Sequence, residues 1–263
     1  MQPTPPSTLD HKKYFFDKFG ITNSLLERCL GEALYAGGDY ADLYFESIAS
    51  TSIGLDESLV KSASQGVSAG CGIRVLSGER TGYAYTDDLS ADRLLHAART
   101  AALIASGPAK QPVAGFTETK APSLYPAPAV DLDIDLSAKL DLVQRADRTA
   151  RAYDPRITQV RAGYADELRR ILIAASDGTF ASDTQPLARL SVFVLAKDAE
   201  KTARGTSGGG GRVEIDFFQT EKSPEHFASE AARQAILQLS AVAAPAGEME
   251  VVLGPGWPGV LLH

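Results

Sequence analysis

The hydrophobic residues near the start of the chain change from a helical period to an alternating one. Apolar side chains recur every three or four residues through 26–33, and Gly37 and Gly38 end that run. Beyond residue 39 apolar and polar residues alternate, most clearly over 43–46. Alternation places one side of the chain against a core and the other toward solvent, which is typical of a strand. We therefore expect a helix followed by a strand.

A second alternating segment leads into a predicted hairpin and a second helix. Cys71, Ile73 and Val75 alternate with small or polar residues, and residues 77–86 add a turn and a further strand. The next helix is expected to begin after Ser90, a residue that favours the N-terminal cap position. Its apolar face consists of Leu94, Leu95, Ala98, Ala101, Ala102 and Ala105.

The second half of the chain repeats this order of a helix, several strands and a helix. Ser137 is the predicted cap of the first of these helices. Strands are expected at 159–166, 168–175 and 190–194, and a long helix is expected to begin near Pro224. Consecutive strands joined by short turns favour an α+β fold, with two units of mostly antiparallel sheet flanked by helices, over a doubly wound parallel sheet.

The pattern divides the chain into five expected segments. They are a helical lead (1–37), a first α+β domain (38–106), a Pro-rich linker (107–131), a second α+β domain (132–244) and the start of a C-terminal domain (245–263). In the last segment, residues 249–253 have strand character and residues 260–263 resemble the first turn of a helix. A domain seldom ends just after such a start, so we expect the chain to be a fragment of a longer protein.

Composition and charge narrow the class of protein. With 44% hydrophobic residues, the 263-residue chain has the composition of a folded globular protein. No apolar run approaches the roughly 18 residues of a membrane span, and the N-terminus lacks the apolar core of a signal peptide. The net charge of -7 disfavours binding to the phosphate backbone of nucleic acid. Cys29 and Cys71 form no Cys-x-x-Cys motif, so we expect reduced thiols in a cytoplasmic protein.

Few residues have the spacing of a metal or nucleophile site. None of the four histidines has another histidine or a cysteine at short spacing. They are His11, His96, His226 and His263. We expect His96 to be partly buried in the core or at its edge, and His11 and His226 to be solvated. Cys71 lies on the inward side of a predicted strand, so we expect a buried structural thiol.

A run of four glycines is the sharpest local feature of the sequence. A phosphate-binding loop would need Lys-Ser or Lys-Thr and a helix after the glycines, whereas residues 212–215 have the pattern of a strand. Two interpretations stay open. The run is either a flexible connection or a loop that lets an extended peptide lie against main-chain donors. In the second case the peptide-binding residues are Gly208, Gly209, Gly210 and Gly211.

Several segments carry a family resemblance. They lie at 38–46, 70–79, 204–212, 239–247 and 251–263. Together they resemble the TldD branch of the TldD/PmbA family. The resemblance covers nearly the whole chain and implies a cytoplasmic zinc metallopeptidase, usually a heterodimer with a PmbA-type (TldE) subunit. The family's active subunit carries a His-Glu-x-x-x-His motif, and a downstream cysteine completes its zinc site. His263 matches the first histidine of that motif, and the other ligands would lie beyond this chain.

The resemblance also implies what the protein acts on. The full-length protein is expected to hydrolyse peptides or unfolded protein segments, with zinc as its cofactor. This chain alone is expected to be inactive, because His263 is a single ligand and zinc needs three or four. The alternative is a non-catalytic PmbA/TldE-like partner or a peptide-binding assembly subunit. Nucleic acid and membrane are not expected as partners.

Overall fold

The order of elements along the chain follows the two-part pattern predicted from the sequence. The computed structural model describes residues 11–106, 113–118, 135–220, 222–256 and 258–263. Its first elements are α1 (His11–Phe19), α2 (Asn23–Leu34), β1 (Tyr40–Asp56), β2 (Leu59–Ser77), β3 (Arg80–Thr86) and α3 (Ala91–Ile104). The later elements are β4 (Thr117–Glu118), α4 (Leu136–Tyr153), β5 (Ile157–Ala175), β6 (Thr179–Asp198), β7 (Lys201–Gly211), η1 (Ile215–Gln219), α5 (Pro224–Leu239) and α6 (Pro258–Leu262).

Several details differ from the sequence-based prediction, and one is that residues 212–215, which have the pattern of a strand, lie outside the strands of the described chain. The two strands expected at 159–166 and 168–175 are one continuous strand, β5, because β1 and β6 both pair with it through this region. Helix α4 is capped by Asp135 rather than Ser137, whose backbone N–H donates to the Asp135 carboxylate at 3.1 Å. Residues 249–253, expected to form a strand, lie outside the strands of the described chain.

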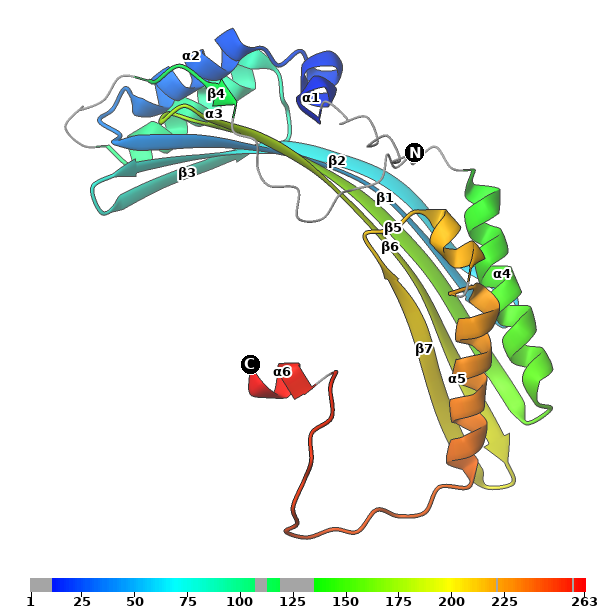
Figure 1. Ribbon diagram of the computed structural model, residues 1–263. Helices are drawn as coiled ribbons and strands as arrows, with labels where there is room; N and C mark the ends of the chain where they lie inside the picture. Colours follow the sequence, from blue (N-terminus) through cyan, green and yellow to red (C-terminus); the bar gives the residue numbers. More distant parts are fainter. Residues whose placement is uncertain (1–10, 107–112, 119–134, 221, 257) are drawn as a thin grey trace, which may run out of the picture.

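The strands of the described residues form one sheet, and the predicted α+β fold is confirmed. The sheet has seven strands in the order β3-β2-β1-β5-β6-β4, and β7 also pairs with β6. All neighbours are antiparallel except β4, which runs parallel to β6. The sheet is strongly curved, and α1 to α5 lie along its convex side, whereas α6 lies on the concave side (Figure 1).

The two halves of the sheet are built alike. In the first half α2 precedes β1, β2, β3 and α3, and in the second half α4 precedes β5, β6, β7 and α5. In both halves the final helix packs on the third strand at a glycine. A Cβ on Gly82 in β3 would collide with the carbonyl oxygen of Ala101 in α3. A Cβ on Gly205 in β7 would collide with that of Ala231 in α5. Glycine therefore permits the same close strand–helix approach twice.

The convex side of the sheet carries the hydrophobic core. Along β1 the buried residues alternate, from Leu43 and Phe45 at one end to Ile53 and Leu55 at the other. The first pair belongs to a cluster beneath α2 and α3, and the second pair to a cluster beneath α4 and α5. The two clusters share one sheet. The expected linker at 107–131 lies mostly outside the described residues, so the predicted domain boundaries stay a prediction.

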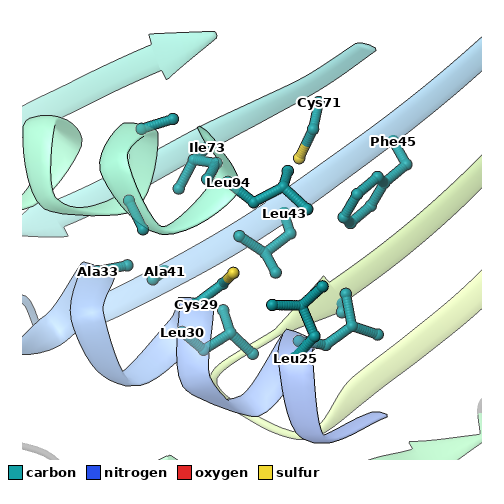
Figure 2. Packing of buried hydrophobic residues seen from close by; sticks show 14 of the residues in the cluster. Leu25, Cys29, Leu30, Ala33, Ala41, Leu43, Phe45, Cys71, Ile73 and Leu94 are labelled. Atoms are coloured by element: carbon teal, nitrogen blue, oxygen red, sulfur yellow. The ribbon is translucent and has the colours of Figure 1, made fainter. Parts of the chain in front are cut away.

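Both cysteines belong to the first cluster. Cys29 of α2 and Cys71 of β2 are buried and free, packed among Leu43, Ile73 and Leu94 (Figure 2). Burial raises the pKa of the Cys29 thiol to about 12, and it raises the pKa of Cys71 well above its usual value. A thiol held in its protonated form is a poor nucleophile and a poor metal ligand. The expectation of a buried structural thiol at Cys71 is confirmed.

A buried ion pair joins α4 to the middle of the sheet. The Lys139 ammonium lies 2.6 Å from the Asp166 carboxylate of β5, and both side chains are almost fully buried. Lys139 also donates to the hydroxyl of Thr51 at 3.0 Å, and the Tyr164 hydroxyl donates to Asp166 at 3.1 Å. Removing one partner of such a pair typically costs about 3–5 kcal/mol, because the other charge stays buried and unpaired. The pair therefore fixes where α4 sits on β5.

A second ion pair, at the surface, links α4 to α5 and should make stability depend on pH. Arg145 donates to both carboxylate oxygens of Glu225 at 2.7 and 2.9 Å, which lowers the pKa of Glu225 to about 2. A lowered pKa stabilises the fold above the ordinary glutamate pKa of 4.5, and this contribution is lost as the pH falls toward 2.

We therefore expect Glu225→Gln to lower the free energy of unfolding by about 0.5–1 kcal/mol at pH 7, a value reduced for solvent screening. The difference from the parent chain should shrink as the pH falls below about 4.5, measured by urea unfolding at several pH values. Glu248→Gln is the control, because Glu248 is exposed and has no ion pair within the described part of the chain. A pH-independent difference would show that the carboxylate charge is not what stabilises this contact.

Candidate functional site

The glycine run belongs to a strand rather than a loop. Residues 208–211 are the last part of β7 and pair with β6, from Ser191↔Gly208 to Ala188↔Gly211. This result corrects the prediction of a flexible connection and of a loop at these positions. In the sequence, a run of glycines resembles a flexible linker. In the structure, the main chain of residues 208–211 pairs with β6 through the regular hydrogen bonds of an antiparallel sheet.

The glycines are needed because β7 lies very close to its neighbours. A Cβ on Gly208 would lie 2.5 Å from the carbonyl oxygen of Leu190, and one on Gly209 would lie 2.6 Å from the ring of Phe227 in α5. A Cβ on Gly210 would collide with the carbonyl oxygen of Ala188. Gly210 and Gly211 also have φ values of +150° and +152°, a region that side chains disfavour. Larger residues would push β7 away from β6 and α5.

The outer edge of β7 is bare. Within the described chain β7 pairs with β6 alone, so its other edge faces no strand. Gly208 and Gly210 are exposed and have no side chains to obstruct an approaching main chain. The edge thus offers backbone N–H and C=O groups to another extended chain.

The concave face of the sheet carries a group of tyrosines that the sequence analysis did not single out. Tyr83 and Tyr85 of β3 are 58% and 62% exposed, and their rings lie over Gly72 and Gly70 of β2. The alternation of Tyr83 and Tyr85 along β3 is the feature of the sequence that could have identified this exposed pair. Beside them Arg74 forms an ion pair with Asp42 at 2.7 Å.

The histidines do not come together. His263 is exposed and follows α6, and His226 is exposed near the start of α5, as predicted. His96 is also exposed, because it lies on the outer side of α3 rather than at the core edge where it was expected. The side chain of His11 lies outside the described residues. Among the described residues, no three His, Cys, Asp or Glu side chains are grouped to hold a metal ion.

The metal implied by the family resemblance therefore does not fit on the described residues alone. Of the exposed histidines at 96, 226 and 263, none is grouped there with two further ligands, and a zinc site needs three or four. We assign no catalytic step to this chain's side chains.

None of the helices in the described part of the chain is long and apolar enough to cross a membrane.

Comparison with known proteins agrees with this architecture. Residues 41–105 match the family model described as PmbA/TldA metallopeptidase domain 1, and residues 130–239 match the PmbA/TldA metallopeptidase central domain. The chain is 42% identical over 232 residues to a metalloprotease TldD homolog of Haemophilus influenzae, covering 86% of this chain and 48% of that protein. It is 37% identical over 231 residues to a homolog of the same name from Buchnera aphidicola subsp. Acyrthosiphon pisum, again covering 86% and 48%.

Solved structures share the fold at lower identity. A protein described as a modulator of DNA gyrase from Thermotoga maritima has a TM-score of 0.69 at 18% identity, covering 85% of this chain and 50% of that one. TldE from Thermococcus kodakarensis has a TM-score of 0.65 at 15% identity, covering 81% and 47%. The chain spans about half the length of the curated relatives that it matches. The fold and both domain matches together show that this chain belongs to the PmbA/TldD metallopeptidase family.

Proposed function

We propose that this chain is the N-terminal portion of a TldD-type zinc metallopeptidase that hydrolyses peptides or unfolded protein segments. The observation that carries the proposal is the bare glycine edge of β7 in a chain of this family. Its role is to hold an extended substrate by strand addition. Such a site reads main chain more than side chains, which suits substrates of varied sequence.

The geometry of β7 sets what the edge accepts. Only an extended, unpaired main chain can add to a strand, because folded segments have already used their N–H and C=O groups. Alternate side chains of the bound peptide would point toward α5, near exposed His226, and toward the concave face, near exposed Thr206. Gly208 and Gly210 have no side chains that could clash with those of the peptide. The edge therefore selects an extended conformation rather than a particular sequence.

His263 is proposed to be one ligand of the zinc site, and the remaining ligands are proposed to lie outside the described part of the chain. Bound zinc would polarise the scissile carbonyl and activate water. A PmbA/TldE-type subunit is the proposed partner, and TldE from Thermococcus kodakarensis has the same fold. The proposed location is the cytoplasm, without a nucleic acid or membrane partner. The alternative function is a non-catalytic, PmbA/TldE-like assembly subunit, which the single candidate ligand favours.

Elemental analysis tests the metal part of the proposal. After dialysis, this chain should hold far less than one zinc per molecule and should not hydrolyse an unfolded peptide, because one histidine cannot retain the ion against water. The control is the same chain with His263→Ala, which should give the same low zinc content. One tightly bound zinc per chain that disappears in His263→Ala would show that the described residues do form a site.

Backbone-modified peptides test the strand-addition part. A fluorescent extended peptide of about twelve residues would span β7. N-methylation of every second residue removes the N–H groups that point to one side of the peptide strand. We expect one N-methylated set to bind at least about tenfold more weakly, and the opposite set to bind like the parent, because only one side of a strand pairs with β7.

Two readouts keep the peptide experiment specific. Fluorescence anisotropy gives the affinities, and hydrogen exchange should show slower exchange for amides of β7 when the parent peptide is bound. Equal binding by both N-methylated sets would contradict strand addition. Binding that protects residues elsewhere would move the peptide site away from the glycine edge.

A matched pair of glycine variants tests the geometry of the edge itself. Gly210→Ala and Gly211→Ala both place a side chain at a φ near +150°, but only the Cβ at 210 meets the main chain of β6. We expect Gly211→Ala to lower the free energy of unfolding by about 1 kcal/mol and Gly210→Ala by roughly 2 kcal/mol more. Urea unfolding measures both values. Equal losses would mean that β7 does not lie as close to β6 as described.

A further inference from the structure

The concave face of the sheet is positively charged beside the β7 edge. Along β6 every second residue from Thr184 to Ala196 is buried beneath the helices, so the residues between them lie on the concave face (Figure 1). Over 187–197 these concave positions include Arg189 and Lys197 and no carboxylate. The concave positions of β7, which alternate with Gly205 and Gly209, include Arg204 and again no carboxylate. These positions of β6 and β7 are called the cationic strip below, and they belong to a chain with a net charge of -7.

Two arginines of the cationic strip lack the carboxylate partner that other arginines on the same face have. Three arginines elsewhere on the concave face form ion pairs with carboxylates of the neighbouring strand β1, at 2.7, 3.0 and 3.7 Å. They are Arg74, Arg161 and Arg169. Arg189 and Arg204 are exposed and form no ion pair with any described residue. A strand added to β7 would be to Arg204 what β1 is to its own neighbours, namely an adjacent strand that can supply a carboxylate.

Arg204 would lie directly beside a strand added to β7. Adjacent strands are about 4.8 Å apart, and opposite charges on facing residues of two such strands attract one another. On its own strand Arg204 has Thr202 and Thr206 as its neighbours on the concave face, and in β6 it pairs with Leu195. None of these side chains carries a charge. The guanidinium of Arg204 is therefore open to a carboxylate of the added chain.

Arg189 lies one strand further from the edge, and a glycine leaves its way to the edge open. It pairs with Gly210 of β7 on one side and with Ala165 of β5 on the other. Because Gly210 has no side chain, the guanidinium of Arg189 can extend over it toward the edge. An added strand would lie two strand spacings, roughly 10 Å, from β6, so a long acidic side chain could meet Arg189 above Gly210.

We propose that the β7 edge binds preferentially those extended peptides that carry two acidic side chains six residues apart. The inference rests on the proposed strand addition to β7 and names the class of substrate that this site takes. Positions 204 and 210 lie on the same face of β7, roughly 20 Å apart, so the peptide residues opposite them also share a face and are six residues apart. One carboxylate then contacts Arg204, and the other contacts Arg189 across Gly210.

The arrangement of the charges favours a peptide over a nucleic acid. A nucleic acid carries a phosphate at every nucleotide and gains its affinity from several phosphate contacts made together. Arg189 and Arg204 are instead far apart, and they lie beside a strand edge whose N–H and C=O groups face no strand within the described chain. Such an edge pairs with the main chain of a peptide, and the two arginines add a preference for occasional acidic side chains.

Fluorescent peptides of about twelve residues with one neutral parent sequence test the proposal, since that length spans β7. The first carries two glutamates six residues apart, and the second carries glutamines at the same positions. The third carries its glutamates five residues apart, which places them on opposite faces of a strand. By fluorescence anisotropy at low salt, we expect the first peptide to bind about fivefold more tightly than the second, because exposed ion pairs contribute modestly. The third should gain only about twofold, since one of its carboxylates faces away from the arginines, and both gains should shrink at high salt.

Variants of the chain assign the preference to the two arginines. Arg189→Gln with Arg204→Gln should remove the advantage of the glutamate peptide and leave the glutamine peptide's affinity unchanged, because main-chain pairing is kept. Arg189→Glu with Arg204→Glu should instead favour a peptide with two lysines six residues apart. The matched control is Arg74→Gln, which removes a positive charge from the same face on the distant strand β2 and should keep the full preference. Circular dichroism confirms that each variant is folded.

The outcomes separate this inference from the strand addition on which it rests. Equal binding of the glutamate and glutamine peptides to the parent chain would overturn the inference alone, whereas binding of neither would overturn both. A preference that survives Arg189→Gln with Arg204→Gln, or an equal gain at five-residue spacing, would assign the carboxylates to other cations and overturn the inference. So would a short single-stranded oligonucleotide that displaces the glutamine peptide more effectively than the glutamate peptide does, because the cationic strip would then be a phosphate site.

Discussion

The antiparallel pairing of β1 with β5 is the constraint on which the rest of the structure depends. It runs from Asp42↔Ala175 to Asp56↔Arg161 without a shift in register and joins the two halves into one sheet. Because side chains alternate between faces, this register keeps the buried residues of both strands on the same, convex side. A slip of one residue would turn one half's core toward solvent. All five helices from α1 to α5 can therefore cover a single face (Figure 1).

The buried ion pair of Lys139 and Asp166 belongs to the same constraint. It lies near the middle of the sheet, between the hydrophobic cluster under α2 and α3 and the cluster under α4 and α5. One oxygen of Asp166 has no hydrogen-bond partner among the described residues, so the pair is not fully satisfied. An apolar replacement of both residues could be as stable, since desolvation offsets much of the attraction. The contribution of the pair is to fix the position of α4 on the sheet, because a shift of α4 would separate the two residues and leave a buried charge without its partner.

The sequence predicts the elements that are fixed locally and misses those that depend on distant contacts. Helical spacing and caps correctly place α2, α3 and α5, and alternation correctly places parts of β1, β2, β3, β5 and β6 but not β7. The polar pair Asp166 and Glu167 suggests a break in β5, but the burial of Asp166 depends on Lys139, which is far away in the sequence. The turn between β1 and β2 has Glu57 and Ser58 at positive φ without the usual turn residues. Ser58 is held there by a hydrogen bond to Asp147 of α4.

The candidate site shows the same difference between features that the local sequence predicts and features that depend on distant contacts. Glycine content alone suggests a flexible loop at 207–212, since nothing in the local sequence indicates a strand. The strand exists because Gly205 and Gly209 let α5 approach and because Gly208 and Gly210 let β6 approach. For the family assignment the long motifs of the sequence were sufficient, whereas the role of the glycines as a close-packed edge required the structure. For His263 the opposite holds. The family resemblance identifies it as a candidate metal ligand, whereas the described part of the structure places no group of further ligands beside it.

The β7 edge combines two properties that the proposed binding of an extended chain requires. Its last glycines keep their register with β6 up to Gly211, and they carry no side chains to obstruct an approaching main chain. The β7 strand also lies beyond β6, at the end of the sheet remote from β3, so an added chain would leave the pairing of β1 with β5 intact.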